Sequence, residues 1–410
     1  MVLNILKNTV LLSVLIVATC GQESENKSVQ NEVLQQQERN ENEISVGANR
    51  TEAYLDDLKG KKVGVVANQT TVIFKSKADD NIHLVDSLLS LDIDIQKVFA
   101  PEHGFRGTAD AGEVVNDGVD VKTGLPIISL YGKNKKPSPQ QLDGLDIVIF
   151  DIQDVGARFY TYISSLHYVM EACAEQGIQV IVFDRPNPNG HYIDGPVLET
   201  EHQSFVGMHP VPVVHGMTIG EYALMINGEK WLANGLNCDL KVIQMQNYAH
   251  SRSYSLPIKP SPNLPNDKAI NLYPSLCFFE GTNVSAGRGT EMQFQIYGSP
   301  YLDTKYNDFS FIPKPNLGSK YPKHQDELCH GKDLRTVDGL KRLHLEWLIE
   351  AYEATANKDD FFIPFFTKLA GTTTLQKQIE DGYTSDEIRK SWLQELEAFK
   401  KMRSPYMLYD

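Results

Sequence analysis

The chain has 410 residues, of which 39 are Lys or Arg and 53 are Asp or Glu, so its formal net charge at pH 7 is −14. At roughly 100–200 residues per domain, this length favours two domains over one. The acidic balance argues against a general nucleic-acid binder, which normally carries a basic surface. Five Cys are too few for a disulfide scaffold, and the single short apolar run excludes a polytopic membrane protein.

The first 50 residues are predicted to be a targeting signal and a tether. Residues 1–19 resemble a secretory signal, with Lys7 as the one charge and an apolar run at 10–18 that is too short to span a bilayer. The run leads to Cys20 in a context that resembles a bacterial lipobox, in which this Cys is lipidated. A free Cys20 beside an ordinary cleavage site is the alternative. Residues 20–50 are polar, lack aromatic side chains and predict a disordered tether.

From residue 62 onward, short apolar runs alternate with helical patterns. The apolar runs predict strands at 62–67, 97–100, 126–130, 146–151 and 179–184, with a further strand at 240–243. Helical periodicity at 82–91 and 163–176 falls between them, and Gly177 ends the second helix. Strands that are apolar on both faces indicate a parallel, doubly wound sheet, which makes this an α/β fold.

The C-terminal part is predicted to be a smaller α+β domain. It combines a short strand at 293–296 with helices at 337–356 and 385–402. Residues 255–275 are rich in Pro and Asn, which is typical of a connection between domains. We therefore assign residues 51–245 to the first domain and 246–410 to the second.

Polar residues follow the carboxyl ends of the predicted strands, where sheets of this kind bind their ligands. Asn68 follows the first strand, and Glu102 follows the second with His103 and Arg106 close by. A carboxylic acid in a partly dry crevice can act as a general acid. A Glu–Arg pair that fixes the loop is the structural alternative.

The segment after the fourth strand carries a second group of candidates. Asp151 and Asp154 suit a general base or a metal ligand, and Arg158 suits an anionic substrate group. Tyr160 can stack on the face of a sugar. Asp154 can instead cap the following helix, and Tyr160 can simply pack in the core.

Two further segments offer polar side chains for substrate binding. Asn187, in the rigid stretch 184–190, can recognise a hydroxyl or acetamido group, or can belong to a Pro-Asn turn. The Gly-rich stretch 280–291 places Arg288 and Glu291 on a loop that could close over the crevice. The sequence has no phosphate-binding Gly motif and no serine-hydrolase motif, so no cofactor is expected.

Five segments in this order resemble the NamZ family of exo-β-N-acetylmuramidases, a family formerly classed as a domain of unknown function. The matching stretches are residues 99–107, 150–160, 184–190, 260–265 and 279–290. The resemblance implies a Rossmann-like N-terminal domain, a smaller C-terminal domain and an active-site cleft between them. It also implies release of N-acetylmuramic acid (MurNAc) from the non-reducing end of peptidoglycan fragments, with MurNAc–GlcNAc saccharides as partners.

Glycoside hydrolysis commonly uses two carboxyl groups that flank the scissile bond. We predict Glu102 as the general acid and Glu291 as the second carboxyl, with Asp151 or Asp154 as the fallback. The acetamido group of the substrate could replace the second carboxyl. The lactyl carboxylate of MurNAc requires a local cation, and the candidates are Arg106, Arg158 and Arg288. His103 is expected to orient Glu102 or to bind a hydroxyl.

Two other classes of function stay open at this point. One is a metal-dependent envelope hydrolase that uses His103, Asp151, His209 and His215, although these residues match no metal-binding spacing. The other is a non-catalytic lipoprotein that binds envelope glycans. All three interpretations predict a protein of the cell envelope, lipid-anchored or periplasmic, that touches the membrane only through its lipid.

Overall fold

The computed structural model describes residues 43–75, 80–106, 117–304 and 308–410. The chain divides into Met1–Ser45 and one compact unit, Val46–Asp410. The predicted signal, Cys20 and most of the predicted tether lie outside the described residues. Among the helices that the structure describes, none is long and apolar enough to cross a membrane.

The compact unit begins earlier than the sequence predicted. Val46 and Ala48 are fully buried in the core, and the backbone N–H of Gly47 donates to the carbonyl oxygen of Asp184. Apolar side chains and a paired backbone therefore place residues 46–50 in the fold, so the predicted boundary at residue 50 is too late.

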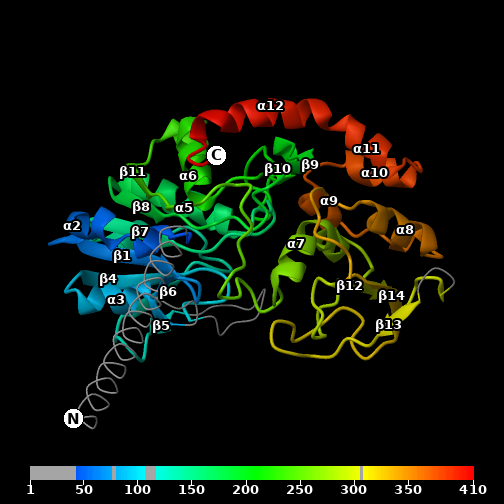
Figure 1. The fold of residues 1–410 in the computed structure, drawn as a ribbon, viewed down its shortest axis with the longest axis horizontal. Coiled ribbons are helices and arrows are strands. Elements are labelled where there is room, and N and C mark those ends of the chain that lie inside the picture. Colours follow the sequence, from blue (N-terminus) through cyan, green and yellow to red (C-terminus); the bar gives the residue numbers. More distant parts are fainter. Residues whose placement is uncertain (1–42, 76–79, 107–116, 305–307) are drawn as a thin grey trace, which may run out of the picture. The chain divides into compact units, whose positions relative to one another are not determined.

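A seven-stranded sheet forms the first part of this unit (Figure 1). Its strand order is β11–β8–β7–β1–β4–β6–β5, and every neighbouring pair is parallel except β5 with β6. The strands are β1 (Lys62–Ala67), β4 (Asp94–Ala100), β5 (Gly118–Val119), β6 (Pro126–Ser129), β7 (Ile147–Asp151), β8 (Gln179–Phe183) and β11 (Leu240–Ile243). The predicted parallel α/β sheet is confirmed.

The central strands are apolar throughout because both faces of the sheet are covered. In β7, Val148 and Phe150 face one core, and Ile147 and Ile149 face the other. The first core contains residues of α5 (Tyr162–Gln176) and α6 (Ile219–Gly228), and the second contains residues of α2 (Leu55–Leu58) and α3 (Leu84–Ser90). The first core continues into the C-terminal part, so the two parts share one hydrophobic interior.

The C-terminal part combines a small antiparallel sheet with helices. The sheet order is β12–β14–β13. Its elements are α7 (Asp267–Leu276), β12 (Ile296–Ser299), β13 (Phe309–Phe311), β14 (Cys329–Asp333), α8 (Glu346–Ala354), α9 (Phe365–Ala370), α10 (Thr374–Glu380), α11 (Ser385–Ser391) and α12 (Leu393–Arg403). The remaining elements are β2 (Val72–Phe74), β3 (Asn81–His83), α4 (Pro139–Leu142), β9 (Asp194–Val197) and β10 (Pro212–Val214).

Several predicted boundaries differ from the observed ones. The helix predicted at 82–91 begins at Leu84, because Ile82 and His83 pair with β2 as part of β3. The strand predicted at 293–296 is shifted to β12, the helix predicted at 337–356 begins only at Glu346, and the helix predicted at 385–402 breaks at Trp392. The domain boundary at 245 stays a prediction.

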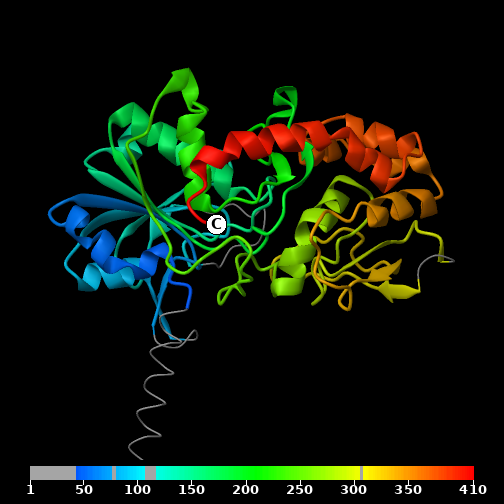
Figure 2. The same ribbon diagram turned by 45° about the horizontal axis from the view of Figure 1, so that its top comes forward.

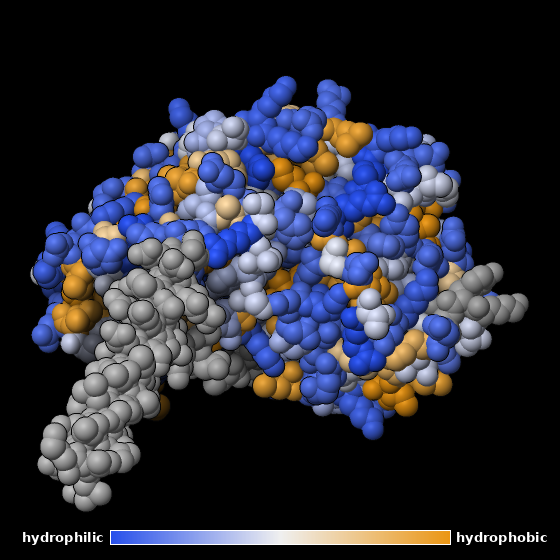
Figure 3. Space-filling view, in the orientation of Figure 1, coloured by the Kyte–Doolittle hydropathy of each residue, from blue (hydrophilic) through white to orange (hydrophobic). Residues whose placement is uncertain are grey.

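The C-terminus returns to the parallel sheet. Figures 1 and 2 show α12 running from α11 back toward α6, where the chain ends. The Tyr409 hydroxyl donates to Oδ2 of Asp184 at 2.7 Å, and the backbone N–H of Leu408 donates to Glu221 at 2.8 Å. These bonds tie the last residues to the end of β8 and the start of α6. The face drawn in Figure 3 is mostly hydrophilic, with apolar groups in scattered patches.

Candidate active site

A pocket of about 420 Å³ lies beyond the carboxyl ends of the parallel strands. Because β4 and β7 flank β1 on opposite sides, the loops that follow them diverge and leave a crevice at this point of the sheet. The pocket is lined by Glu102, His103, Tyr131, Lys135, Phe159, Tyr160, Thr161, Phe205, Val206, Ser261, Asn263, Leu264, Tyr273, Glu280, Arg288, Phe294 and Phe365. Its walls therefore come from both parts of the compact unit.

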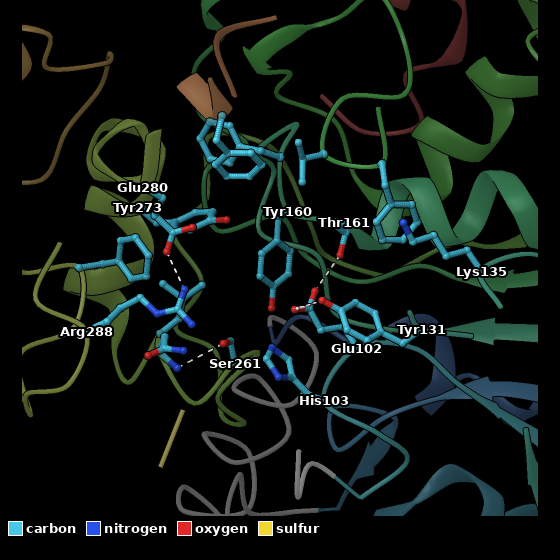
Figure 4. A pocket seen from close by; sticks show the side chains of 17 residues that line it. Glu102, His103, Tyr131, Lys135, Tyr160, Thr161, Ser261, Tyr273, Glu280 and Arg288 are labelled. Carbon is cyan, nitrogen blue, oxygen red and sulfur yellow. Dashed lines mark hydrogen bonds and ion pairs between the residues drawn. The ribbon is translucent and has the colours of Figure 1, made fainter. Parts of the chain in front are cut away.

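Glu102 is held in the pocket by two hydroxyl groups. The Tyr131 hydroxyl donates to Oε1 at 3.1 Å, and the Thr161 hydroxyl donates to Oε2 at 3.0 Å (Figure 4). Burial and the neighbouring Glu102 carboxylate raise the pKa of Tyr131, so this hydroxyl keeps its proton and donates. Behind the side chain, the Tyr162 hydroxyl donates to the backbone carbonyl of Glu102 at 3.3 Å. Both the carboxyl group and its backbone are thus fixed.

His103 has an unusual backbone conformation beside Glu102. Its φ is +72°, and Gly104 follows with φ of +75°. A left-handed conformation is rare for a residue with a Cβ and recurs at functional sites, where the surrounding structure maintains it. The N–H of Gly104 closes this turn onto the Pro101 carbonyl at 3.0 Å. The turn directs both the Glu102 and the His103 side chains into the pocket.

The opposite wall carries a second carboxyl group with its own cation. Nη1 of Arg288 lies 2.7 Å from Oε1 of Glu280, and Figure 4 shows this pair across the pocket from Glu102, with Tyr160 between them. Glu280 belongs to the short 3₁₀ helix Cys277–Gly281 that follows α7. Lys323 supports this segment by donating to the carbonyl oxygens of Phe279, Thr282 and Val284.

Aromatic rings form much of the remaining wall. Tyr160 packs edge-to-face against Tyr162 at 5.0 Å and against Tyr273 at 5.8 Å, and Phe294 packs against Tyr273 at 4.9 Å. The Tyr160 hydroxyl donates to the Pro260 carbonyl at 2.8 Å. The pocket therefore combines two carboxyl groups with apolar ring surfaces, a combination that suits the polar edges and apolar faces of a sugar.

Two family models match almost all of the compact unit. The N-terminal model of the exo-β-N-acetylmuramidase NamZ family matches residues 63–268, and the C-terminal model matches residues 271–409. The chain belongs to the NamZ family. A NamZ relative from Bacillus subtilis (strain 168), named a peptidoglycan β-N-acetylmuramidase, is 38% identical over 381 residues, which cover 87% of this chain and 89% of the relative. The resemblance stated from the sequence is confirmed.

Solved structures from Bacteroides fragilis NCTC 9343 share the fold of this NamZ-family chain. One DUF1343 family protein is 45% identical and superposes with a TM-score of 0.81, covering 90% of this chain and 99% of its own. A second is 28% identical, with a TM-score of 0.77 and the same coverage. Both span the parallel sheet and the C-terminal part together.

The pocket of this NamZ-family chain brings together four of the residues predicted from the sequence. Glu102, His103, Tyr160 and Arg288 line it, and their roles in substrate binding or catalysis stay predictions. Asn68 lies behind the pocket wall, where it is fully buried and donates to the Tyr162 hydroxyl at 2.9 Å. Asn68 thus supports the residue that fixes the Glu102 backbone and does not itself line the pocket.

The two fallback carboxyl groups are buried outside the pocket. Asp151 pairs through both oxygens with the Arg185 guanidinium, at 2.6 and 2.8 Å. Asp154 accepts from the Gly156 N–H at 2.7 Å, and its Oδ2 lies 3.8 Å from Nε2 of His215. Burial raises the pKa of Asp154 to about 7. Neither residue is placed to reach a substrate in the pocket.

Two of the three predicted cations, Arg106 and Arg158, bind protein groups outside the pocket. Arg106 forms ion pairs with Asp86 at 3.2 Å and Asp120 at 2.7 Å, outside the pocket. Arg158 is fully buried and donates to four carbonyl oxygens. Those carbonyls belong to Pro196, Val211, Leu369 and Ala370. Arg158 therefore joins the β9–β10 region to the end of α9 and has no access to a substrate.

Asn187 and Glu291 also lie outside the pocket lining. Asn187 donates to the Met217 carbonyl at 2.9 Å and packs against Gly156, where an added Cβ would lie 2.3 Å from its side chain. These contacts agree with the alternative given for Asn187, a structural role in the Pro-Asn turn. Glu291 is exposed, and Glu280, from the same Gly-rich stretch, lines the pocket.

The four residues of the metal alternative are not gathered into one ligand set. Asp151 is paired with Arg185, and His209 is hydrogen-bonded to His167 and Tyr222. Within the described ranges, the one group of side chains close enough to share an ion is Glu199, Glu201 and His202 on the surface. The geometry therefore gives no support to a metal-dependent site made of His103, Asp151, His209 and His215.

Sequence reasoning missed several pocket residues. The most informative are Tyr131, Lys135, Thr161, Ser261 and Glu280. Tyr131 and Lys135 follow the third predicted strand, so the same strand-end rule that selected Glu102 would have found them. Thr161 directly follows the stretch 150–160, and Glu280 lies inside the stretch 280–291, both of which were singled out for other residues.

Proposed function

We propose that this chain is an exo-acting β-N-acetylmuramidase that releases MurNAc from the non-reducing end of peptidoglycan fragments. The observation that carries the proposal is a NamZ-family pocket in which Glu102 is fixed by two hydroxyl groups and faces a second carboxyl group. A pocket of about 420 Å³ has the size of a small-ligand site. One terminal sugar fits such a volume, as exo-action requires.

Glu102 is the proposed general acid. Its carboxyl proton passes to the glycosidic oxygen while the bond between that oxygen and the anomeric carbon breaks. Tyr131 and Thr161 hold the plane of the carboxyl group, so little reorganisation is needed when the proton moves. Water finally supplies the oxygen that remains on the anomeric carbon of MurNAc.

Glu280 is the proposed second carboxyl group, in place of Glu291. It lies on the wall that faces Glu102 and forms an ion pair with the Arg288 guanidinium at 2.7 Å. An anion at this position stabilises the positive charge that develops on the sugar ring in the transition state. Lys323 anchors the backbone on both sides of Glu280.

The test is incubation of the protein with the disaccharide MurNAc-β-1,4-GlcNAc, followed by mass spectrometry of the products. Equal amounts of free MurNAc and GlcNAc are expected. An intact disaccharide, in a protein that binds it, would contradict the proposal and favour a glycan-binding protein. A parallel reaction with a chelator is expected to be unaffected, and loss of activity there would favour the metal-dependent alternative.

We also propose that the protein is attached to the cell envelope through a lipid on Cys20. The support is the sequence alone, an apolar run followed by Thr19-Cys20 and a polar stretch. The N-terminal peptide of protein from a bacterial membrane fraction should carry a diacylglyceryl mass on Cys20. A mature N-terminus elsewhere, or an unmodified Cys20, would overturn this proposal.

A further inference from the structure

The pocket contains a cation that no carboxylate partners within the described residues. Lys135 lies between β6 and α4 and lines the pocket together with Glu102. Its side chain is half-buried, and its Nζ lies 4.3 Å from the centroid of the Phe205 ring. The Phe205 ring is itself stacked on Tyr168, at 6.2 Å and 12°. The ammonium group is therefore held at the pocket wall by a fixed aromatic surface.

The neighbouring lysine shows the contrast. Nζ of Lys136 forms ion pairs with two residues of α5, Glu171 at 2.7 Å and Glu175 at 2.8 Å. No such pair neutralises Lys135 in the part of the chain that the structure describes. A cation–π contact also leaves the three N–H donors of an ammonium group for other acceptors.

The other candidate cations do not compete for an anion in the pocket. Arg288 lines it, but its Nη1 pairs with Glu280 and its Nη2 donates to the Gly318 carbonyl. Arg106 and Arg158 lie outside it, with the partners described above. Since Glu102 and Glu280 give the pocket an acidic character, an anionic substrate would be repelled without a cation such as Lys135.

We propose that Lys135 binds the lactyl carboxylate of MurNAc and so determines the preference of the pocket for MurNAc over sugars without this group. This inference rests on the proposed function. MurNAc differs from GlcNAc by the lactyl ether, which carries a carboxylate, and a charge-assisted bond to an ammonium group discriminates strongly between them. Lys135 is a specificity-determining residue and takes no part in proton transfer.

The experiment compares two disaccharides, MurNAc-β-1,4-GlcNAc and its neutral lactyl carboxamide, with wild-type protein and three variants. For the carboxylate substrate, Lys135→Met should raise KM about tenfold to a hundredfold with kcat within about threefold. For the carboxamide, Lys135→Met should match the wild type. Lys135→Arg keeps the charge and should retain most of the preference, and Lys133→Met, at an exposed position in the same loop, should change neither substrate.

An equal loss on both substrates would overturn the proposal, because it would indicate a structural role for Lys135. Thermal unfolding of each variant shows whether the fold is kept. Calorimetric binding of free MurNAc and GlcNAc separates this inference from the proposed function. If the wild type binds MurNAc more tightly than GlcNAc and Lys135→Met binds both equally, Lys135 recognises the lactyl carboxylate. This result would support the inference even if the protein did not hydrolyse the disaccharide. If the wild type does not discriminate between the two sugars, the inference fails.

Discussion

The carboxylate of Glu280 and the guanidinium of Arg288 form an ion pair of 2.7 Å on the pocket wall that faces Glu102. Glu291 lies eleven residues further along the same Gly-rich stretch and is exposed. The two acids look equivalent in the sequence, since both border the Gly-rich segment. Only one of them reaches the pocket, because the 3₁₀ helix at Cys277–Gly281 and the Lys323 contacts fix Glu280 there.

Glu280→Gln should therefore lower kcat for MurNAc release about a hundredfold or more, since the neutral amide cannot stabilise the developing positive charge. Glu291→Gln is the matched control and should stay within about twofold of the wild type. The measurement is the initial rate of MurNAc release at saturating disaccharide. A large effect at Glu291 with little effect at Glu280 would restore the original prediction from the sequence.

Tyr131→Phe and Thr161→Val each remove one hydroxyl that holds Glu102. Each should lower kcat about tenfold, the equivalent of roughly 1.4 kcal/mol for a lost hydrogen bond, with little change in KM. Tyr321→Phe, at a highly exposed tyrosine, is the control. If the losses appeared in KM alone, the two hydroxyls would serve substrate binding and not the position of Glu102.

Arg158→Met should destabilise the fold without any direct effect on the chemistry. Four buried carbonyl groups would lose their donor, which we expect to cost about 3 kcal/mol or more. Urea unfolding followed by circular dichroism measures the change. Arg342→Met, at a position where the side chain is 59% exposed, should change stability by less than about 0.5 kcal/mol. Equal stability of the two variants would contradict a structural role for Arg158.

Asp154→Asn tests the buried carboxyl group beside His215. Burial raises the pKa of Asp154 from its ordinary value of 3.8 to about 7, so the folded state binds this proton more tightly than the unfolded state. The contribution of the carboxyl is complete below about pH 4 and is lost as the pH rises toward 7. Asn cannot ionise, so the stability of Asp154→Asn relative to the wild type should increase by roughly 2–4 kcal/mol between pH 4 and pH 8. Urea unfolding at four pH values measures this, and a constant difference would contradict it.

The elements of the parallel sheet were predictable because their signal is local. The apolar run at 62–67 coincides with β1, and the helix predicted at 163–176 ends at Gly177, whose φ of +68° suits a residue without a Cβ. Boundaries failed where tertiary contacts decide. The break between α11 and α12 at Trp392 is an example. The helical spacing of apolar residues continues across this break, because Leu396 and Phe399 extend the buried face, so the sequence pattern does not reveal it.

Two of the predicted pocket residues follow from their place just beyond a strand. Glu102 and His103 come shortly after β4, and the topology then places them in the crevice. Tyr160 and Arg288 were selected by residue type, as an aromatic ring and a cation, and no strand of the described residues directly precedes either of them. Arg158 shows the limit of this reasoning: a charge near a strand end suggests an anion site, but here carbonyl oxygens from distant segments surround it. Which side chain of an irregular loop faces the pocket depends on packing that the sequence does not display.

The central claim is that Glu102 supplies the proton for release of MurNAc. The most direct measurement is the rate of MurNAc release from MurNAc-β-1,4-GlcNAc by Glu102→Gln, together with its thermal unfolding. The amide keeps the shape of the side chain but cannot donate an acidic proton, so release should fall at least a thousandfold while the unfolding temperature stays within a few degrees. Release at a rate close to that of the wild type, in a folded variant, would contradict the assignment of the acid.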